Sequence, residues 1–277
     1  MQEKQKKSGT LFVVIDPIAE TQLALEKAMS IAQACDFDIH AFVCVYESAG
    51  RGVGEEARWQ QKASLLQTTE ERVENLLQNC REAEIACDSE VAWNSNWVDS
   101  ALRSITRSNY ALVVKSNFDY SKAKRRYSRN SDFSLMRYSN SPVLFTSRPE
   151  PWDNKRLLAC VEVQSADDDH NRLNAQILKQ ARRLADLLDL ELEVATCFRD
   201  RILFRPEIVA NRFKVLPEQV HLYEGPIIES LQQVYVDLDP AILMLGTIAR
   251  KGFGDKLVGS TTEKLLDLVE TDILTVV

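Results

Sequence analysis

The chain alternates short apolar runs with longer segments whose apolar residues recur every three or four positions. The first run is LFVVID at 11–16, and a helical pattern follows at 20–35. Further runs begin at 39, 85, 110 and 142, with helical patterns at 55–84, 97–108 and 132–138 between them. Apolar runs are typical of strands covered on both faces, and their alternation with amphipathic helices predicts parallel βαβ units.

The same order of elements begins again in the second half. LLACVEV at 157–163 and the helical pattern at 171–188 match the first strand and helix, and strands at 190–198, 241–247 and 272–277 follow. Aligning Cys44 with Cys197 and Lys115 with Gly246 leaves the second half shorter between these points, where two prolines limit any helix.

A short proline-containing linker at 149–152 separates the two halves. We therefore predict two modules, 1–150 and 151–277. Each is expected to be a doubly wound α/β module with a five-stranded, mainly parallel sheet of order 3-2-1-4-5.

Composition adds limits on location and partners. The chain has 277 residues, 45% of them hydrophobic, and a net charge of −7, which argues against general nucleic-acid binding. Its six cysteines show no metal or disulfide spacing and fit buried thiols in a reducing compartment. The first apolar run is too short for a signal peptide or a spanning helix. We expect a cytoplasmic protein with no membrane span and no specific nucleic acid as partner.

A glycine-bearing turn lies between a strand and a helix of the second half. Its residues include Gly246, Thr247, Ala249, Gly259, Ser260 and Thr261. Such a turn offers unpaired backbone N–H groups and the positive end of a helix dipole to a phosphate, and the two hydroxyls would add donors. An ordinary turn with an N-cap serine would have the same residues, so both interpretations stay open.

This motif and the closing segment LVGSTTEKLLDLVETDILTVV resemble the universal stress proteins. Two modules in one chain, VVIDP at 13–17 and AWN at 92–94 resemble the E-type tandem members of bacteria. The resemblance implies a non-enzymatic cytoplasmic stress-response protein, linked to stress and DNA-damage resistance, that acts by binding a ligand or partner. It also implies an intrachain pseudo-dimer formed through the last strands, 142–147 and 272–277, and leaves a homodimer open.

The resemblance also assigns a nucleotide site, in the second half. The first glycine of the family motif matches Gly246, the second is replaced by Ala249, and Glu162 stands for the first-strand aspartate. The candidate cofactor-binding residues are Glu162, Cys197, Gly246, Thr247, Ala249, Gly259, Ser260 and Thr261. The Cβ of Ala249 pushes back a closely approaching ligand, so the motif is partial. The alternative function is an ATP-binding switch through this module, which leaves slow ATP hydrolysis open.

The first half departs further from the motif. Lys115 and Phe118 stand at the two glycine positions and the loop at 120–130 has no glycine, although Asp16 keeps its place. We expect no ordinary ATP binding there. Trp93 and Trp97 either pack in the core or suit an apolar, lipid-like ligand. The basic residues of the loop form either an anion site or a solvated surface.

No catalytic constellation and no metal site is expected. His40, His170 and His221 have no metal-like neighbours at helical spacing, and the aspartates at 167–169 are typical of a polar turn before a helix. The chain has neither a GxSxG elbow nor a P-loop lysine motif. ATP is the one candidate cofactor.

Overall fold

The chain forms two compact units. The computed structural model describes residues 9–48, 54–116, 131–149, 151–152, 155–165, 167–199, 205–247 and 260–276. The first unit holds the described residues up to 116 together with Tyr138–Ser141, and the second holds the other described residues. This division follows contacts, whereas the module boundary near residue 150 follows the sequence repeat and stays a prediction.

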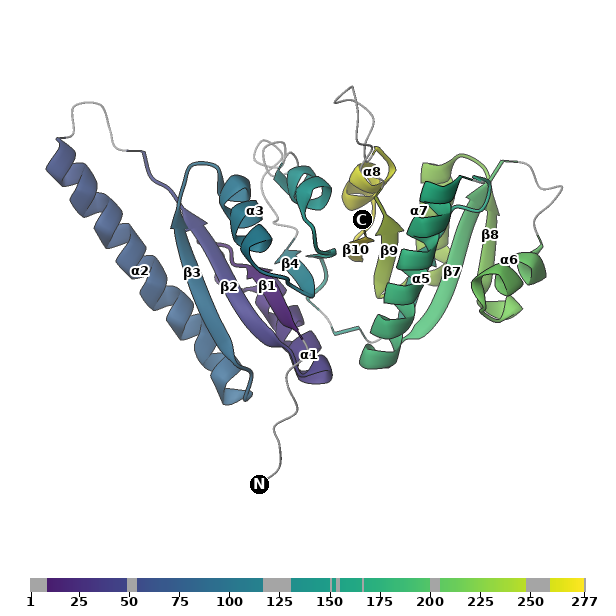
Figure 1. The fold of residues 1–277 in the computed structure, drawn as a ribbon, viewed down its shortest axis with the longest axis horizontal. Helices are drawn as coiled ribbons and strands as arrows, with labels where there is room; N and C mark the ends of the chain where they lie inside the picture. The colour runs from purple at the N-terminus through teal and green to yellow at the C-terminus, as the bar shows by residue number, and fades with distance from the viewer. Residues whose placement is uncertain are drawn as a thin grey trace. The chain divides into compact units, whose positions relative to one another are not determined.

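The first unit has a parallel sheet whose strands alternate with helices along the chain (Figure 1). Its elements are β1 (Thr10–Val14), α1 (Leu23–Cys35), β2 (Asp38–Val45), α2 (Glu55–Glu82), β3 (Cys87–Trp93), α3 (Trp97–Arg107) and β4 (Leu112–Ser116). The strand order is β3-β2-β1-β4, and neighbouring strands run parallel. Residues 131–138, which follow later in the chain, are helical as predicted.

The second unit repeats this order and adds two strands, β5 and β10. Its elements are β5 (Val143–Thr146), β6 (Arg156–Cys160), α5 (Asp168–Leu188), β7 (Glu191–Phe198), α6 (Pro206–Phe213), η2 (Pro217–Gln219), β8 (Val220–Glu224), α7 (Ile227–Leu238), β9 (Ile242–Gly246), α8 (Ser260–Leu268) and β10 (Asp272–Val276). The order is β8-β7-β6-β9-β10-β5, parallel except for the antiparallel pair of β10 and β5. The strands β8-β7-β6-β9-β10 have the predicted order 3-2-1-4-5, and the four strands of the first unit have the order 3-2-1-4.

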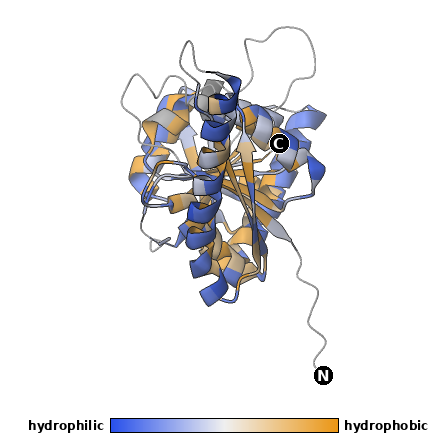
Figure 2. Ribbon diagram, turned by 90° about the vertical axis from the view of Figure 1, so that its left-hand side faces the viewer, coloured by the Kyte–Doolittle hydropathy of each residue, from blue (hydrophilic) through white to orange (hydrophobic). Residues whose placement is uncertain are grey.

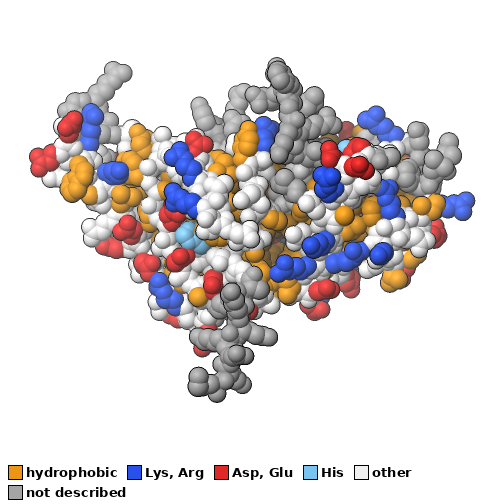
Figure 3. All heavy atoms as spheres, in the orientation of Figure 1, with side chains coloured by type: hydrophobic (Ala, Val, Ile, Leu, Met, Phe, Trp, Pro, Cys, Tyr) orange, Lys and Arg blue, Asp and Glu red, His pale blue; other side chains and the backbone are white. Residues whose placement is uncertain are grey.

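The strands form the core, and each helix packs against them through an apolar stripe on one of its faces. In β1, Leu11, Phe12 and Val13 are fully buried, as the continuous apolar run predicts. In α2 one stripe is buried, at Thr69, Val73, Leu77 and Cys80, whereas the rest of the helix is largely exposed. Figure 2 shows this contrast, with α2 mostly blue in front of orange strands. Figure 3 shows basic and acidic side chains interspersed over the face in view.

The shortening of the second half lies where the sequence places it. The first unit has the 28-residue α2 between its second and third strands, whereas the second unit has the 8-residue α6 and the 3-10 turn η2. Pro206 and Pro217 occupy the first positions of these two elements. A proline is tolerated at a helix start, but it stops a helix that would otherwise run through it.

The strand register corrects the alignment of the two halves by one residue. Leu11 and Leu157 lie equally far before Asp16 and Glu162, and they pair with Leu112 and Ile242. Counting along β4 and β9 from this pair makes Ser116 the counterpart of Gly246. The alignment of Lys115 with Gly246 was therefore wrong, and Lys115 corresponds to the residue before that glycine, Leu245. Residue types alone cannot fix the register of two buried strands, because both faces are apolar.

No helix among the described residues has the length and apolarity needed to span a membrane.

Candidate functional site

A cavity of about 220 Å³ opens at the carboxyl ends of β6, β7 and β9 in the second unit. The chain leaves β6 for β7 on one side of it, and returns later to β9 on the other side. Ligands of open α/β sheets bind at such a switch point, where the strand order reverses. The cavity thus lies where the fold places a ligand.

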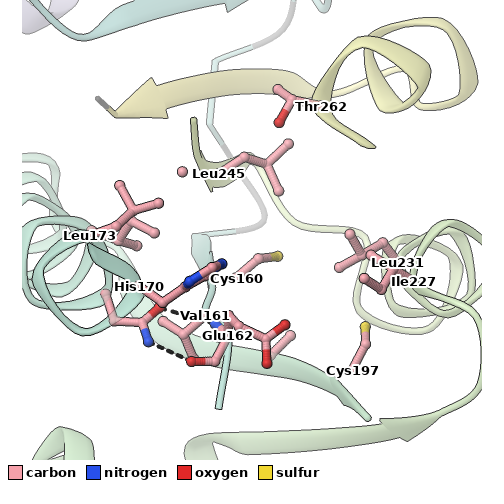
Figure 4. Close-up of a pocket in the computed structure, with 14 residues that line it drawn as sticks. Cys160, Val161, Glu162, His170, Leu173, Cys197, Ile227, Leu231, Leu245 and Thr262 are labelled. Carbon is pink, nitrogen blue, oxygen red and sulfur yellow. Dashed lines mark hydrogen bonds between the residues drawn. The ribbon is translucent and has the colours of Figure 1, made fainter. Parts of the chain in front are cut away.

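Side chains from strands and helices line this cavity (Figure 4). They are Cys160, Val161, Glu162, His170, Leu173, Asn174, Ile177, Ala195, Cys197, Ile227, Leu231, Leu245, Gly246 and Thr262. Three residues that the sequence analysis singled out, Glu162, Cys197 and Gly246, are therefore brought together. We refer to this space as the Glu162 cavity.

Glu162 is held by the loop that it begins. Its Oε1 accepts the backbone N–H groups of Gln164, at 2.6 Å, and Ser165, at 3.3 Å. The side chain of Asn174 accepts the Glu162 N–H at 3.0 Å and donates to its carbonyl oxygen. From α6, Arg212 donates to the carbonyl oxygen of Val163 at 3.2 Å. These bonds fix the carboxylate at the cavity, because they leave the loop few other conformations.

The first unit repeats this arrangement around Asp16. Its Oδ1 accepts the N–H groups of Ile18 and Ala19, while Gln22 accepts the Asp16 N–H and donates to its carbonyl oxygen. From α2, Arg72 donates to the carbonyl oxygens of Pro17 and Ala19. The loop after the first strand is therefore a repeated structural device. It does not by itself show that a half binds a ligand.

Gly246 is required by the packing of α5. A Cβ at this position would lie 2.5 Å from Leu173 Cδ2 and 2.8 Å from Ile177 Cδ1, closer than side chains approach each other. In the first unit the counterpart Ser116 fits, because α1 presents the small Ala24, whose N–H donates to Ser116 Oγ at 2.9 Å. A helix–strand contact thus accounts for this glycine without a phosphate.

The two cavity cysteines are protonated thiols. Burial raises the pKa of Cys197 to about 11, a hydrogen bond with Ser230 lowers it, and the nearby charge of Glu162 raises it further. Burial also raises the pKa of Cys160, with a further contribution from Cys197. Thiolates are the nucleophilic form of cysteine, so these side chains act as apolar lining near neutral pH.

His170 also lines the cavity, although the sequence analysis did not name it as a candidate binding residue. Asp167 caps α5 by accepting the His170 N–H at 2.9 Å, and its carboxylate lies 2.7 Å from His170 Nδ1. Hydrogen bonds from the Ser165 hydroxyl and from His170 hold the pKa of Asp167 well below its usual range. The run DDDH signals a helix start, but only the position of that start relative to β6 brings the imidazole to the cavity.

The remaining candidate residues lie beside the cavity or outside the described residues. Thr247 is buried beside the cavity and not in its lining, and its N–H and hydroxyl both donate to the Val276 carbonyl oxygen. Ser260 and Thr261 begin α8, where the next residue, Thr262, lines the cavity. The expectations for Ala249 and Gly259, for Phe118 and for the loop at 120–130 lie outside the described residues.

At the positions of the first unit that are equivalent to three cavity-lining residues, the side chains are bulkier. By strand register and helix starts, the pairs are Ala195 with Phe42, Ile227 with Trp97, and Leu245 with Lys115. Lys115 is fully buried, donates to the Ser116 carbonyl oxygen at 2.8 Å and lies 5.6 Å from the centre of the Trp97 ring. The first unit therefore has larger side chains at three positions that line the Glu162 cavity in the second unit.

The described histidines pair with carboxylates and do not gather into a metal-binding group. No group of three or more His, Cys, Asp and Glu side chains there is arranged to hold a metal ion. His40 and His221 each pair with a carboxylate on a neighbouring strand, Asp88 and Glu193 respectively.

The chain is similar in sequence to curated universal stress proteins over nearly its whole length. It is 23% identical to the Universal stress protein E homolog of Haemophilus influenzae, covering 97% of each chain. It is 21% identical to Universal stress protein E of Salmonella typhi, covering 96% of this chain and 93% of the relative. No family model matches the chain.

Solved structures share the fold. A functionally unknown protein from Pseudomonas aeruginosa PAO1 has a TM-score of 0.74 at 25% identity, covering 96% of this chain and 92% of its own. A universal stress protein from Archaeoglobus fulgidus has a TM-score of 0.74 at 12% identity, covering 96% and 95%. The fold is that of a tandem universal stress protein. The relatives in sequence are proteins of the E type, which confirms the resemblance stated above.

Proposed function

We propose that the protein is a non-enzymatic stress-response protein that acts by binding a small ligand in the Glu162 cavity. The observation that carries the proposal is a cavity at the switch point of the second sheet, lined by three of the residues that the sequence selects. The names of the relatives support the stress-response role. The raised thiol pKa values of Cys160 and Cys197 argue against nucleophilic catalysis there.

Mass spectrometry of small molecules released from freshly purified protein tests this proposal. The matched variant is Ala195→Phe, which places in the cavity the residue that the first unit has at the equivalent position, Phe42. We expect one molecule per chain from the wild-type protein and none from this variant. An equal yield from both proteins would place the ligand elsewhere.

The second candidate is an ATP-binding switch through the second module. Thr262 belongs to the first turn of α8 and lines the cavity, so the positive end of this helix dipole adjoins it. The switch predicts that ATP with Mg²⁺ raises the melting temperature of the wild-type protein. It also predicts that Gly259→Asp, which brings a carboxylate to the candidate phosphate site, removes this shift. Slow ATP hydrolysis belongs to this candidate, and no thermal shift at millimolar ATP would eliminate it.

The last strand of each sequence repeat takes part in one antiparallel pair, in which Val143 lies opposite Thr275 and Phe145 opposite Ile273. This pairing supports the proposal of an intrachain pseudo-dimer. Light scattering on the purified chain separates a monomer of 31.5 kDa from a homodimer of twice that mass. We place the protein in the cytoplasm, and fractionation of cells tests that location.

A further inference from the structure

One oxygen of Glu162 is available to a ligand. Its Oε1 is used by the Gln164 and Ser165 N–H groups, and no residue in the described part of the chain donates to Oε2. The side chain is half-buried. Figure 4 shows it among the residues that line the cavity. A carboxylate in a partly dry site is stabilised by a donor or a cation, and this carboxylate has an oxygen left for one.

His170 supplies a second acceptor. Asp167 lies 2.7 Å from Nδ1, so in the neutral imidazole the proton sits on Nδ1 and Nε2 carries a lone pair. No described residue bonds to this Nε2, and His170 lines the same cavity as Glu162. With a neutral imidazole, both polar groups that the described chain leaves for a ligand at this end of the cavity are acceptors.

The rest of the described lining is apolar or weakly polar and includes no lysine and no arginine. Leu173, Ile177 and Leu231 form apolar walls beside the protonated thiols. The carboxylate of Glu162 contributes to the raised pKa of Cys197, so its charge acts on groups inside the cavity. A carboxylate charge disfavours an anionic group beside it and favours a cationic one.

We propose that the Glu162 cavity binds an apolar molecule that ends in a protonated amine, with the ammonium group on Glu162 Oε2 and the apolar body against the Leu173, Ile177 and Leu231 side chains. An ammonium group has three donors and no acceptor, which matches two acceptors and a carboxylate charge. A volume of about 220 Å³ is below the usual size of a pocket for a drug-sized ligand, so the ligand is small. This inference rests on the proposed function, because it names the ligand class of the same cavity.

A matched series of probes tests the proposal on the full chain. Hexylamine, hexanol and hexanoate share one apolar body and differ in the charge at its end. We expect hexylamine to bind about tenfold or more tightly than hexanol, measured by titration calorimetry and by the shift in melting temperature, and hexanoate to bind most weakly.

Two variants locate the effect. Glu162→Gln should bring the affinities for hexylamine and hexanol within about twofold of each other, because the charge is gone while the shape is kept. The matched control is Asp16→Asn, which makes the same change in the repeated loop of the first unit and should leave the preference for hexylamine intact. Ala195→Phe should abolish binding of all three probes.

Equal binding of the three probes, tightest binding of hexanoate, or no binding of any of them would overturn the amine assignment. The amine assignment also fails if ATP displaces bound hexylamine from the wild-type protein at a lower concentration than hexylamine needs to displace bound ATP. The proposed function would survive each of these results if a molecule still co-purifies with the wild-type protein and not with Ala195→Phe. It would fail separately if none co-purifies.

Discussion

The side-chain amide of Asn174 brackets the backbone of Glu162, accepting its N–H at 3.0 Å and donating to its carbonyl oxygen. Gln22 makes the same two bonds to Asp16 in the first unit. The two halves therefore keep the same loop after the first strand, although a cavity lies beside Glu162 and bulkier side chains lie at the equivalent positions near Asp16. The loop is a requirement of the fold, and the side chains around it decide whether a ligand has room.

Removing the amide should destabilise either half. Asn174→Ala leaves a partly buried N–H and a carbonyl oxygen without partners, which costs about 1–3 kcal/mol of unfolding free energy. Gln22→Ala should cost a similar amount, because it breaks the same pair of bonds. Urea unfolding measures both. An Asn174→Ala protein as stable as wild type would show that water replaces the amide at no cost.

Gly246→Ala should destabilise the second unit by about 1–3 kcal/mol, because the new Cβ overlaps the Leu173 and Ile177 side chains. Shortening Leu173 to Ala removes the closest atoms. The double variant should then lose less stability than the sum of the two single variants, with a coupling of about 0.5–3 kcal/mol. In the first unit the equivalent Ser116 already carries a Cβ, because the small Ala24 of α1 lies beside it. Strict additivity would mean that α5 moves away without cost.

Alkylation of Cys197 should be slow at pH 8 and should accelerate toward pH 11, because burial raises its pKa to about 11 and the thiolate is the reactive form. Glu162→Gln removes the negative charge that adds to this rise, so it should lower the pKa and speed the reaction. Peptide mass spectrometry after iodoacetamide treatment measures the rates. Cys44, whose pKa is also raised by burial, should react at an unchanged rate in this variant. Slower labelling of Cys197 in Glu162→Gln would contradict the assigned charge effect.

Asp167 should make stability depend on pH in the acid range. Its pKa is lowered in the folded protein, so its contribution is present above the usual aspartate range, near pH 4, and is lost as the pH falls through the folded pKa. The difference in melting temperature between wild type and Asp167→Asn should therefore be constant above about pH 6 and shrink below about pH 4. Asp168→Asn, one residue further on, is the control. A difference that stays constant down to pH 2 would show that the carboxylate charge is not involved.

The sequence determined the fold class, the order of the strands and the place of the shortened helix. These properties depend on local patterns. Continuous apolar runs form buried strands, helical periodicity forms the covering helices, and prolines limit α6 and η2 wherever they stand. The resemblance to the universal stress proteins also selected Glu162, Cys197 and Gly246, and the fold brings them together because the carboxyl ends of parallel strands meet at one edge of the sheet.

Tertiary structure decided what stands around those residues. The register of β4 against β1 made Ser116 the counterpart of Gly246, which buried apolar strands do not reveal in sequence. The cap at Asp167 brought His170 to the cavity. A glycine in a strand leaves room either for a ligand or for a closely packed helix. At Gly246 the side chain of Leu173, from the distant helix α5, takes that room. Packing depends on pairs of side chains from distant segments, and these pairs come into contact only in the folded chain.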